Sequence, residues 1–198
     1  MPLYQNTAVD TDKLVIGNYM IFGGTVTTTI NACLTVTSIE SVLTNIGAGI
    51  INSFGHNVEK YDVQAGNAPD PIEGIASETF TISGELIEYD GTKLAAVMGG
   101  LVTSSASSST VFSVVTGGGL SEITPKTFVL VNRRIVAGAS VLTMIYLYKG
   151  TFVNGPQFTA KSDNDTDPIN TMSFEIQGEI DGNRTAGDQL YSIRKWKD

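Results

Sequence analysis

Two short stretches share one pattern and decide the fold: Phe80-Thr81-Ile82-Ser83-Gly84-Glu85-Leu86 and Phe174-Glu175-Ile176-Gln177-Gly178-Glu179-Ile180. In each, large apolar residues alternate with polar residues, which is the period of a β-strand with one buried face. The alternation places the glutamates on the solvent side of both strands. Two similar core strands of one sheet and a short internal duplication both explain the match. Seven residues are few, so similar strands are the favoured reading.

The composition of the whole chain favours strands over helices. It has 198 residues, of which 41% are hydrophobic and 16% charged, and long stretches are rich in threonine, valine and isoleucine. We therefore predict a single domain over residues 1–198 with a mainly β fold. It should be an antiparallel β-sandwich or barrel with one short packed α-helix and extended arms or loops. The helix is expected at Thr92–Met98, where Gly99-Gly100 would end it.

Three segments are expected outside the core. They are an N-terminal arm at 1–12, a long interaction loop at about 52–76 and a C-terminal arm at about 183–198. The loop prediction rests on its glycines, prolines and acids, with isolated large groups between them, since long loops in compact domains usually bind something. Between Cys33 and Ile51 both helix and strand remain open. Apolar residues recur there at helical spacing behind Ser38, but Gly47 and Gly49 disfavour a helix.

The net charge of −8 and the pI near 4.6 exclude a conventional nucleic-acid binder, because the molecule as a whole should repel phosphates. The N-terminal residues lack the basic and apolar parts of a signal peptide, which predicts synthesis in a cytoplasm without export. The longest apolar stretch, Val141–Tyr148, is too short to span a membrane. We expect no membrane partner.

Catalytic and metal-binding residues are scarce. The one histidine, His56, rules out a multi-histidine metal site within one chain, and a surface or interface role suits it better than a catalytic triad. The one cysteine, Cys33, sits in an apolar context and is expected to be a small core residue. Gly117-Gly118-Gly119 lacks the lysine of a phosphate loop, and Arg133-Arg134 lacks a surrounding basic patch. We therefore predict a protein that is not an enzyme and has no cofactor.

One acidic turn supports an alternative of another class. Asp163, Asp165 and Asp167 have the spacing of a calcium loop, which would make the chain a calcium-dependent binding or hydrolytic module. The rest of the loop disagrees, because Pro168 and Phe174 occupy the positions of the required glycine and bidentate acid. A solvated acidic turn is preferred.

Taken in order, the central and C-terminal residues resemble those of phage tail tube proteins. The resemblance rests on the strand 77–86, the helix Thr92–Met98 with Gly99-Gly100, and the late strand 152–161 followed by residues 168–182. It implies one short helix packed against a β-sandwich or barrel. It also implies a structural virion protein that forms rings, commonly hexameric, stacked into a hollow tube through which DNA passes at infection.

The resemblance further implies the partners. They are other copies of the chain, a tape-measure protein, a tail terminator and tail-tip or baseplate proteins, with double-stranded DNA crossing the lumen without specific binding. The protein would be assembled in the host cytoplasm and reside in the virion tail. Another virion component, such as a head-decoration or tail-completion protein, would share the acidic, β-rich and cysteine-poor profile.

The residues suit such an assembly in two ways. An acidic wall would repel DNA, and the lumen-facing candidates are Glu85, Glu175, Gln177 and Glu179. Large apolar or aromatic groups on segments outside the core are typical anchors between subunits. The subunit and ring-interface candidates are Leu3, Tyr4, Phe54, His56, Tyr61, Tyr191, Ile193 and Trp196. For the C-terminal three, packing onto their own domain is an equal alternative.

Overall fold

Strands dominate the computed structural model, which describes residues 18–63, 72–89, 101–107, 110–116, 124–136, 138–159 and 171–197. The predicted mainly β, antiparallel fold is confirmed. The two short helices are a 3-10 helix, η1 (Thr29–Ala32), and α1 (Val36–Glu40). The strands are β1 (Tyr19–Thr25), β2 (Thr44–Val63), β3 (Ile72–Tyr89), β4 (Leu101–Ser107), β5 (Thr110–Thr116), β6 (Lys126–Val136), β7 (Ala139–Thr159), β8 (Thr171–Gly178) and β9 (Tyr191–Lys197).

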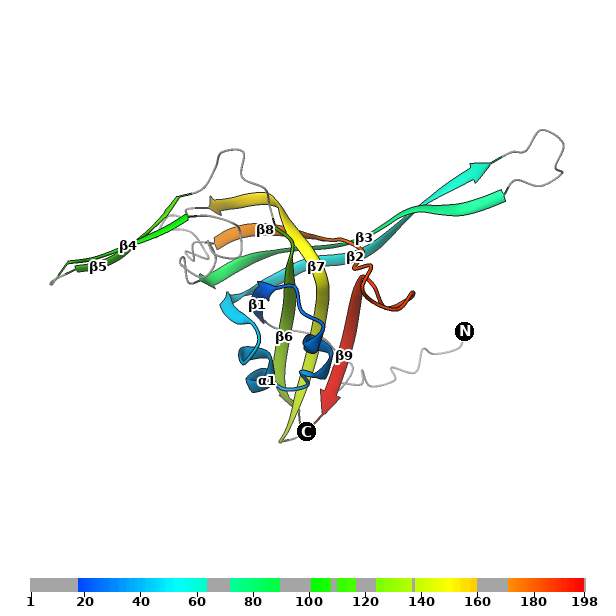
Figure 1. Cartoon of the computed structure of the whole chain (residues 1–198). Coiled ribbons are helices and arrows are strands. Elements are labelled where there is room, and N and C mark those ends of the chain that lie inside the picture. Colours follow the sequence, from blue (N-terminus) through cyan, green and yellow to red (C-terminus); the bar gives the residue numbers. More distant parts are fainter. Residues whose placement is uncertain are drawn as a thin grey trace, which may run out of the picture.

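Seven of these strands form one sheet that closes on itself. Their order is β6-β1-β2-β3-β8-β7-β9, every pairing is antiparallel, and β7 also pairs with β6. The hydrogen-bonded neighbours β6, β1, β2, β3, β8 and β7 therefore make a closed ring. β9 continues past the end of β8 along the same edge of β7. The hairpin of β4 and β5 is a separate two-stranded sheet on the opposite side of the molecule from the far end of β2 and β3 (Figure 1).

The interior of the closed sheet holds the main core. Alternate residues of β3 and β8 point inward, so that both quoted stretches supply buried side chains on every second position, as their pattern predicts. Glycine interrupts this series at Gly84, where a Cβ would lie 2.4 Å from the carbonyl oxygen of Ile50 and 3.0 Å from the Phe174 ring. The fully enclosed members include Ile21, Ile46, Phe80, Ile82, Leu86, Phe128, Leu130, Ile145, Leu147 and Ile176.

A second core lies on the outer side of the sheet, beneath η1 and α1. Helix α1 begins at the N-cap Thr35, which forms a reciprocal capping box with Ser38. Its one buried residue, Ile39, packs with Leu43, Cys33 and residues of β6 and β7. Cys33 is 5% exposed, which confirms its prediction as a small core residue. Neither described helix has the length and hydrophobicity needed to cross a membrane.

The region between Cys33 and Ile51 contains both structures that its sequence left open. Its first part forms α1, and β2 begins at Thr44. Gly47 and Gly49 therefore lie in a strand. At Gly49 a Cβ would meet the Glu85 carbonyl oxygen at 2.1 Å, so the close approach of β3 explains this glycine. The predicted helix at Thr92–Met98 lies outside the described residues.

The predicted loop at 52–76 is wrong for the described part of that range. β2 continues to Val63 and β3 starts at Ile72, and the two pair along this length. We call residues 52–63 and 72–79 the ribbon, because here β2 and β3 pair with each other and leave the ring of strands (Figure 1). Cross-strand hydrogen bonds pair the backbone groups that face the partner strand, and water can bond the others, so the segment needs neither a core nor a continuous apolar pattern to be extended.

The predicted C-terminal arm is also wrong over most of its length. Residues Tyr191–Lys197 form β9, which pairs with β7 from Leu147 to Val141. The preceding residues make a compact turn region in which Asp181 is 4% exposed. The tail thus packs onto its own domain, one of the two alternatives considered for it. The predicted N-terminal arm at 1–12 lies outside the described residues.

Candidate functional site: a polar face and a forked edge

The outer face of β3 and β8 is polar, and three of the four lumen-facing candidates lie on it. Opposite residues of an antiparallel pair point to the same side of a sheet. The register places Thr81 opposite Gln177, Ser83 opposite Glu175, and Glu85 opposite Ser173. These side chains are half-buried, and the residues between them fill the core. The strand pairing therefore brings Glu85, Glu175 and Gln177 onto one surface.

The fourth candidate, Glu179, lies just beyond the end of β8 and has a different environment. Its carboxylate is 3.0 Å from the Lys149 ammonium group, and its backbone N–H donates to the Lys149 carbonyl oxygen at 2.8 Å. The charge of Glu179 is thus offset by a neighbour on β7. Its side chain belongs to the rim of the polar face, where the Lys149 ammonium group reduces its negative potential.

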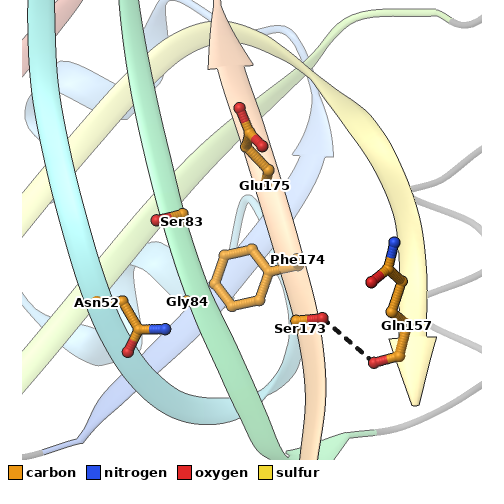
Figure 2. Close-up of a pocket in the computed structure, with 7 residues that line it drawn as sticks. All are labelled: Asn52, Ser83, Gly84, Gln157, Ser173, Phe174 and Glu175. Atoms are coloured by element: carbon orange, nitrogen blue, oxygen red, sulfur yellow. Dashed lines mark hydrogen bonds between the residues drawn. The ribbon is translucent and has the colours of Figure 1, made fainter. Parts of the chain in front are cut away.

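A shallow hollow of about 210 Å³ lies in the polar face. Four strands contribute to it, with Asn52 from β2, Ser83 from β3, Gln157 from β7, and Ser173 and Glu175 from β8 (Figure 2). The Ser173 hydroxyl donates to the carbonyl oxygen of Gln157 at 3.3 Å. The hydroxyl group of Ser83 is 2.8 Å from that of its neighbour Ser53 on β2. The surface offers short hydroxyls, amides and a carboxylate, a chemistry that holds water and repels anions.

The strand segments that build this face contain neither lysine nor arginine, and their one histidine is His56. Residues 48–59 of β2, 77–89 of β3, 150–159 of β7 and 171–178 of β8 include five glutamates and neither lysine nor arginine. Basic residues are concentrated on β6 and β9 instead. Negative and positive charges are therefore unevenly distributed over the sheet.

The second feature is a fork where the ribbon and β9 diverge (Figure 1). At its base the Tyr191 ring stacks on Phe80, with centroids 4.0 Å apart, and the His56 ring meets Tyr191 edge-on at 5.6 Å. His56 Nε2 is also 3.7 Å from a carboxylate oxygen of Glu78. A hollow of about 420 Å³ lies here, lined by His56, Glu78, Tyr191 and Ile193 among others. The fork brings together two predicted interface residues that are 135 positions apart in sequence, His56 and Tyr191.

Four further interface candidates are exposed, two on each prong of the fork. On the ribbon, Phe54 is 46% and Tyr61 is 49% exposed; on β9, Ile193 and Trp196 are each 48% exposed. Leu3 and Tyr4 lie outside the described residues, as do the three aspartates of the predicted calcium alternative. Within the described part of the chain, histidine, cysteine and acidic residues form no group of three that could hold a metal ion.

Two arginines that the sequence analysis did not single out hold the C-terminal part in place. Arg194 of β9 lies over the Tyr146 ring at 4.6 Å, and its guanidinium donates to the backbone and side-chain oxygens of Asn31 at 2.7 and 3.0 Å. Arg184 lies over the Tyr148 ring at 3.3 Å and pairs with Asp188. These contacts join residues up to 163 positions apart, so no local pattern predicts them.

The tyrosines under these arginines are shielded from water. Burial raises the pKa of Tyr146 to about 12, against the opposing charge of Arg194. Burial also raises the pKa of Tyr148, whose hydroxyl donates to Asp188 at 2.7 Å. Both groups are therefore neutral hydrogen-bond donors with a structural role.

No protein-family model matches the chain, and no curated protein matches it either. The function must therefore be inferred from the polar face and the fork themselves. The first is a surface without cations, and the second is a pair of strand edges with exposed apolar groups.

Proposed function

We propose that this protein is the repeating subunit of a phage tail tube. In this role copies of the chain form rings, commonly hexameric, and the rings stack into a hollow conduit for double-stranded DNA. Its partners are other copies of itself, a tape-measure protein, a terminator and tip proteins. The protein resides in the virion tail.

The observation that carries the proposal is the cation-free outer face of β2, β3, β8 and β7. Glu85 and Glu175 lie on it among serine, threonine and glutamine side chains, and those strand segments include neither lysine nor arginine. A conduit for DNA must not bind the phosphates that pass along it, and carboxylates on its wall repel them. The polar groups of this surface are hydroxyls, amides and carboxylates, which meet that requirement.

The unpaired strand edges give the proposal its second support. Among the described strands, β9 has a neighbour only on the β7 side, and in the ribbon β2 and β3 pair only with each other. Such edges can add strands from another copy through backbone hydrogen bonds. A subunit built to assemble needs edges of this kind, whereas a monomeric protein usually protects them.

The wall function can be tested by reversing its charge. We expect the assembled wild-type protein not to retain double-stranded DNA. The variant carrying both Glu85→Lys and Glu175→Lys should assemble and retain DNA at least about tenfold better at low salt, with an affinity that falls steeply as salt increases. Retention can be measured by co-sedimentation of DNA with the assembled protein.

A matched control separates position from net charge. Glu40 is exposed at the end of α1, away from the polar face, and Glu40→Lys makes there the same charge change as either wall substitution alone. It should leave DNA retention within about twofold of wild type, because it does not touch the wall. Tight DNA binding by the wild-type assembly, or no gain in the double variant, would refute the wall assignment.

A further inference from the structure

The two prongs of the fork both end in unpaired edges. β9 is the terminal strand of the sheet order. The ribbon leaves the closed ring of β-strands where β8 stops pairing with β3, at Phe80. From the contact between His56 and Tyr191 the prongs separate, with the ribbon leading away from the body and β9 running along β7 (Figure 1). The two edges of one copy therefore do not pair with each other.

Both prongs also carry apolar side chains that are about half exposed. On the ribbon, Val58 is 42% and Ile75 is 57% exposed, in addition to Phe54. On β9, Ile193 and Trp196 are each about half exposed. Exposed apolar groups beside an open strand edge are typical of a surface that another strand covers.

The prongs have opposite charge. The sequence of the ribbon includes four acidic residues, Glu59, Asp62, Glu73 and Glu78, and one lysine, Lys60. The sequence of β9 carries three cations and no carboxylate: Arg194, Lys195 and Lys197. Like charges directly opposite one another destabilise a strand pair, and opposite charges favour it. The ribbon edge is thus matched to the edge of β9 and mismatched to a second ribbon.

We propose that the ribbon of one copy pairs edge to edge with β9 of a second copy. This inference rests on the proposed function, because it specifies the contact by which the subunits join. Two different surfaces meet in such a contact, so it is heterologous, and repeated contacts of this kind close into rings or continue as filaments. A self-complementary dimer would instead require one surface to meet itself.

Charge-reversed variants test the contact and show whether it is formed between copies. Glu78 is one-third exposed on the ribbon and Lys195 is exposed on β9. We expect Glu78→Lys alone and Lys195→Glu alone each to raise about tenfold the protein concentration at which half of the chain sediments as assembly. The first variant places an added cation on the ribbon against the cations of β9, and the second places an added carboxylate on β9 against the carboxylates of the ribbon.

Mixing the two variants gives the decisive result. In an equimolar mixture the substituted ribbon of one variant can meet the substituted β9 of the other, which restores an opposite-charge pair. The unsubstituted ribbon and the unsubstituted β9 can also meet. The mixture should therefore assemble within about twofold of the wild-type concentration, since the charge pairs are restored between copies. Glu40→Lys, which makes the same charge change on α1, should assemble like wild type.

Each contrary outcome has a separate meaning. Assembly by both variants at wild-type concentration would overturn the proposed contact and leave the proposed function standing. Weakened assembly that mixing does not restore would place the charge pair within one copy and also overturn the contact. A wild-type protein that stays monomeric at all concentrations would refute the proposed function and the contact with it.

Discussion

β2 and β3 run through two regions of the molecule with different surroundings. In the closed sheet their side chains face an enclosed core, where Ile46 and Ile82 are fully buried. In the ribbon the same two strands expose apolar side chains such as Val58 and Ile75. The pairing between the strands is continuous across both regions. The comparison shows that strand pairing and burial are separate properties, and that the closed sheet contributes stability whereas the ribbon is available for contact.

The largest difference between the regions should come from truncating one apolar side chain in each. We expect Ile82→Ala to lower the free energy of unfolding by about 2–5 kcal/mol, since it removes buried methyl groups and leaves a cavity. Val58→Ala should lower it by less than about 0.5 kcal/mol because the side chain is already exposed. Urea unfolding of both variants measures this, and equal effects would show that the ribbon has a core of its own.

A pair of glycines on the same strands sharpens the comparison. At Gly84 a Cβ would meet the Ile50 carbonyl oxygen, whereas at Gly55 in the ribbon nothing lies within 4 Å of one. Gly84→Ala should therefore destabilise the protein by about 3 kcal/mol through overpacking. Gly55→Ala should be neutral or slightly stabilising. Thermal unfolding measures both effects. A lower melting temperature for Gly55→Ala than for Gly84→Ala would contradict this packing.

The second core can be examined through Tyr146, whose hydroxyl donates to the Cys33 carbonyl oxygen. Tyr146→Phe should cost about 1–2 kcal/mol, because that buried carbonyl loses its partner. The folded-state pKa is raised from 10.0 to about 12, so the folded state holds this proton more tightly than the unfolded state. The resulting stability is fully present below pH 10 and is lost as pH rises towards 12.

The pH dependence supplies the control for that variant. Tyr146→Phe should lose less stability than wild type between pH 10 and pH 12, because it has no phenol to ionise there. Unfolding curves at several pH values across this interval measure the difference. Identical losses in the two proteins would show that Tyr146 is not shielded from water.

The smallest effect on stability should come from the contacts of Arg194, which hold β9 against the rest of the domain. Arg194→Ala removes the contact with the Tyr146 ring and the hydrogen bonds to Asn31, which should cost about 1 kcal/mol. Arg194→Lys should recover only part of this loss, since an ammonium group cannot make the paired contacts of a guanidinium. Faster amide hydrogen exchange confined to β9 in Arg194→Ala would support the role of Arg194 in holding this strand on the body. Unchanged exchange would contradict that role.

The sequence predicted most of the closed sheet and little of the ribbon, for a physical reason. The alternation in Phe80–Leu86 and Phe174–Ile180 reflects burial of one face, so it revealed the strands, the inward core and the polar positions of Glu85 and Glu175. The ribbon buries neither face completely. Its composition therefore looks like a loop, although backbone pairing makes it a strand pair.

The fork could not be predicted from local patterns. Its defining contacts join His56 to Tyr191 and Arg194 to Asn31, which are far apart in sequence. The basic residues of β9 are visible in the sequence, but their meaning depends on the unpaired edge beside them. The tail was expected to be an arm because its large apolar groups are typical of anchors between subunits, and pairing with β7 makes it a strand instead.

The central claim is that this chain builds a tube from copies of itself. Electron microscopy of the purified wild-type protein over a range of high concentrations tests it most directly. We predict long hollow tubes made of stacked rings, with the polar face of β3 and β8 lining the lumen. Stable monomers or closed trimers at every concentration would contradict the claim.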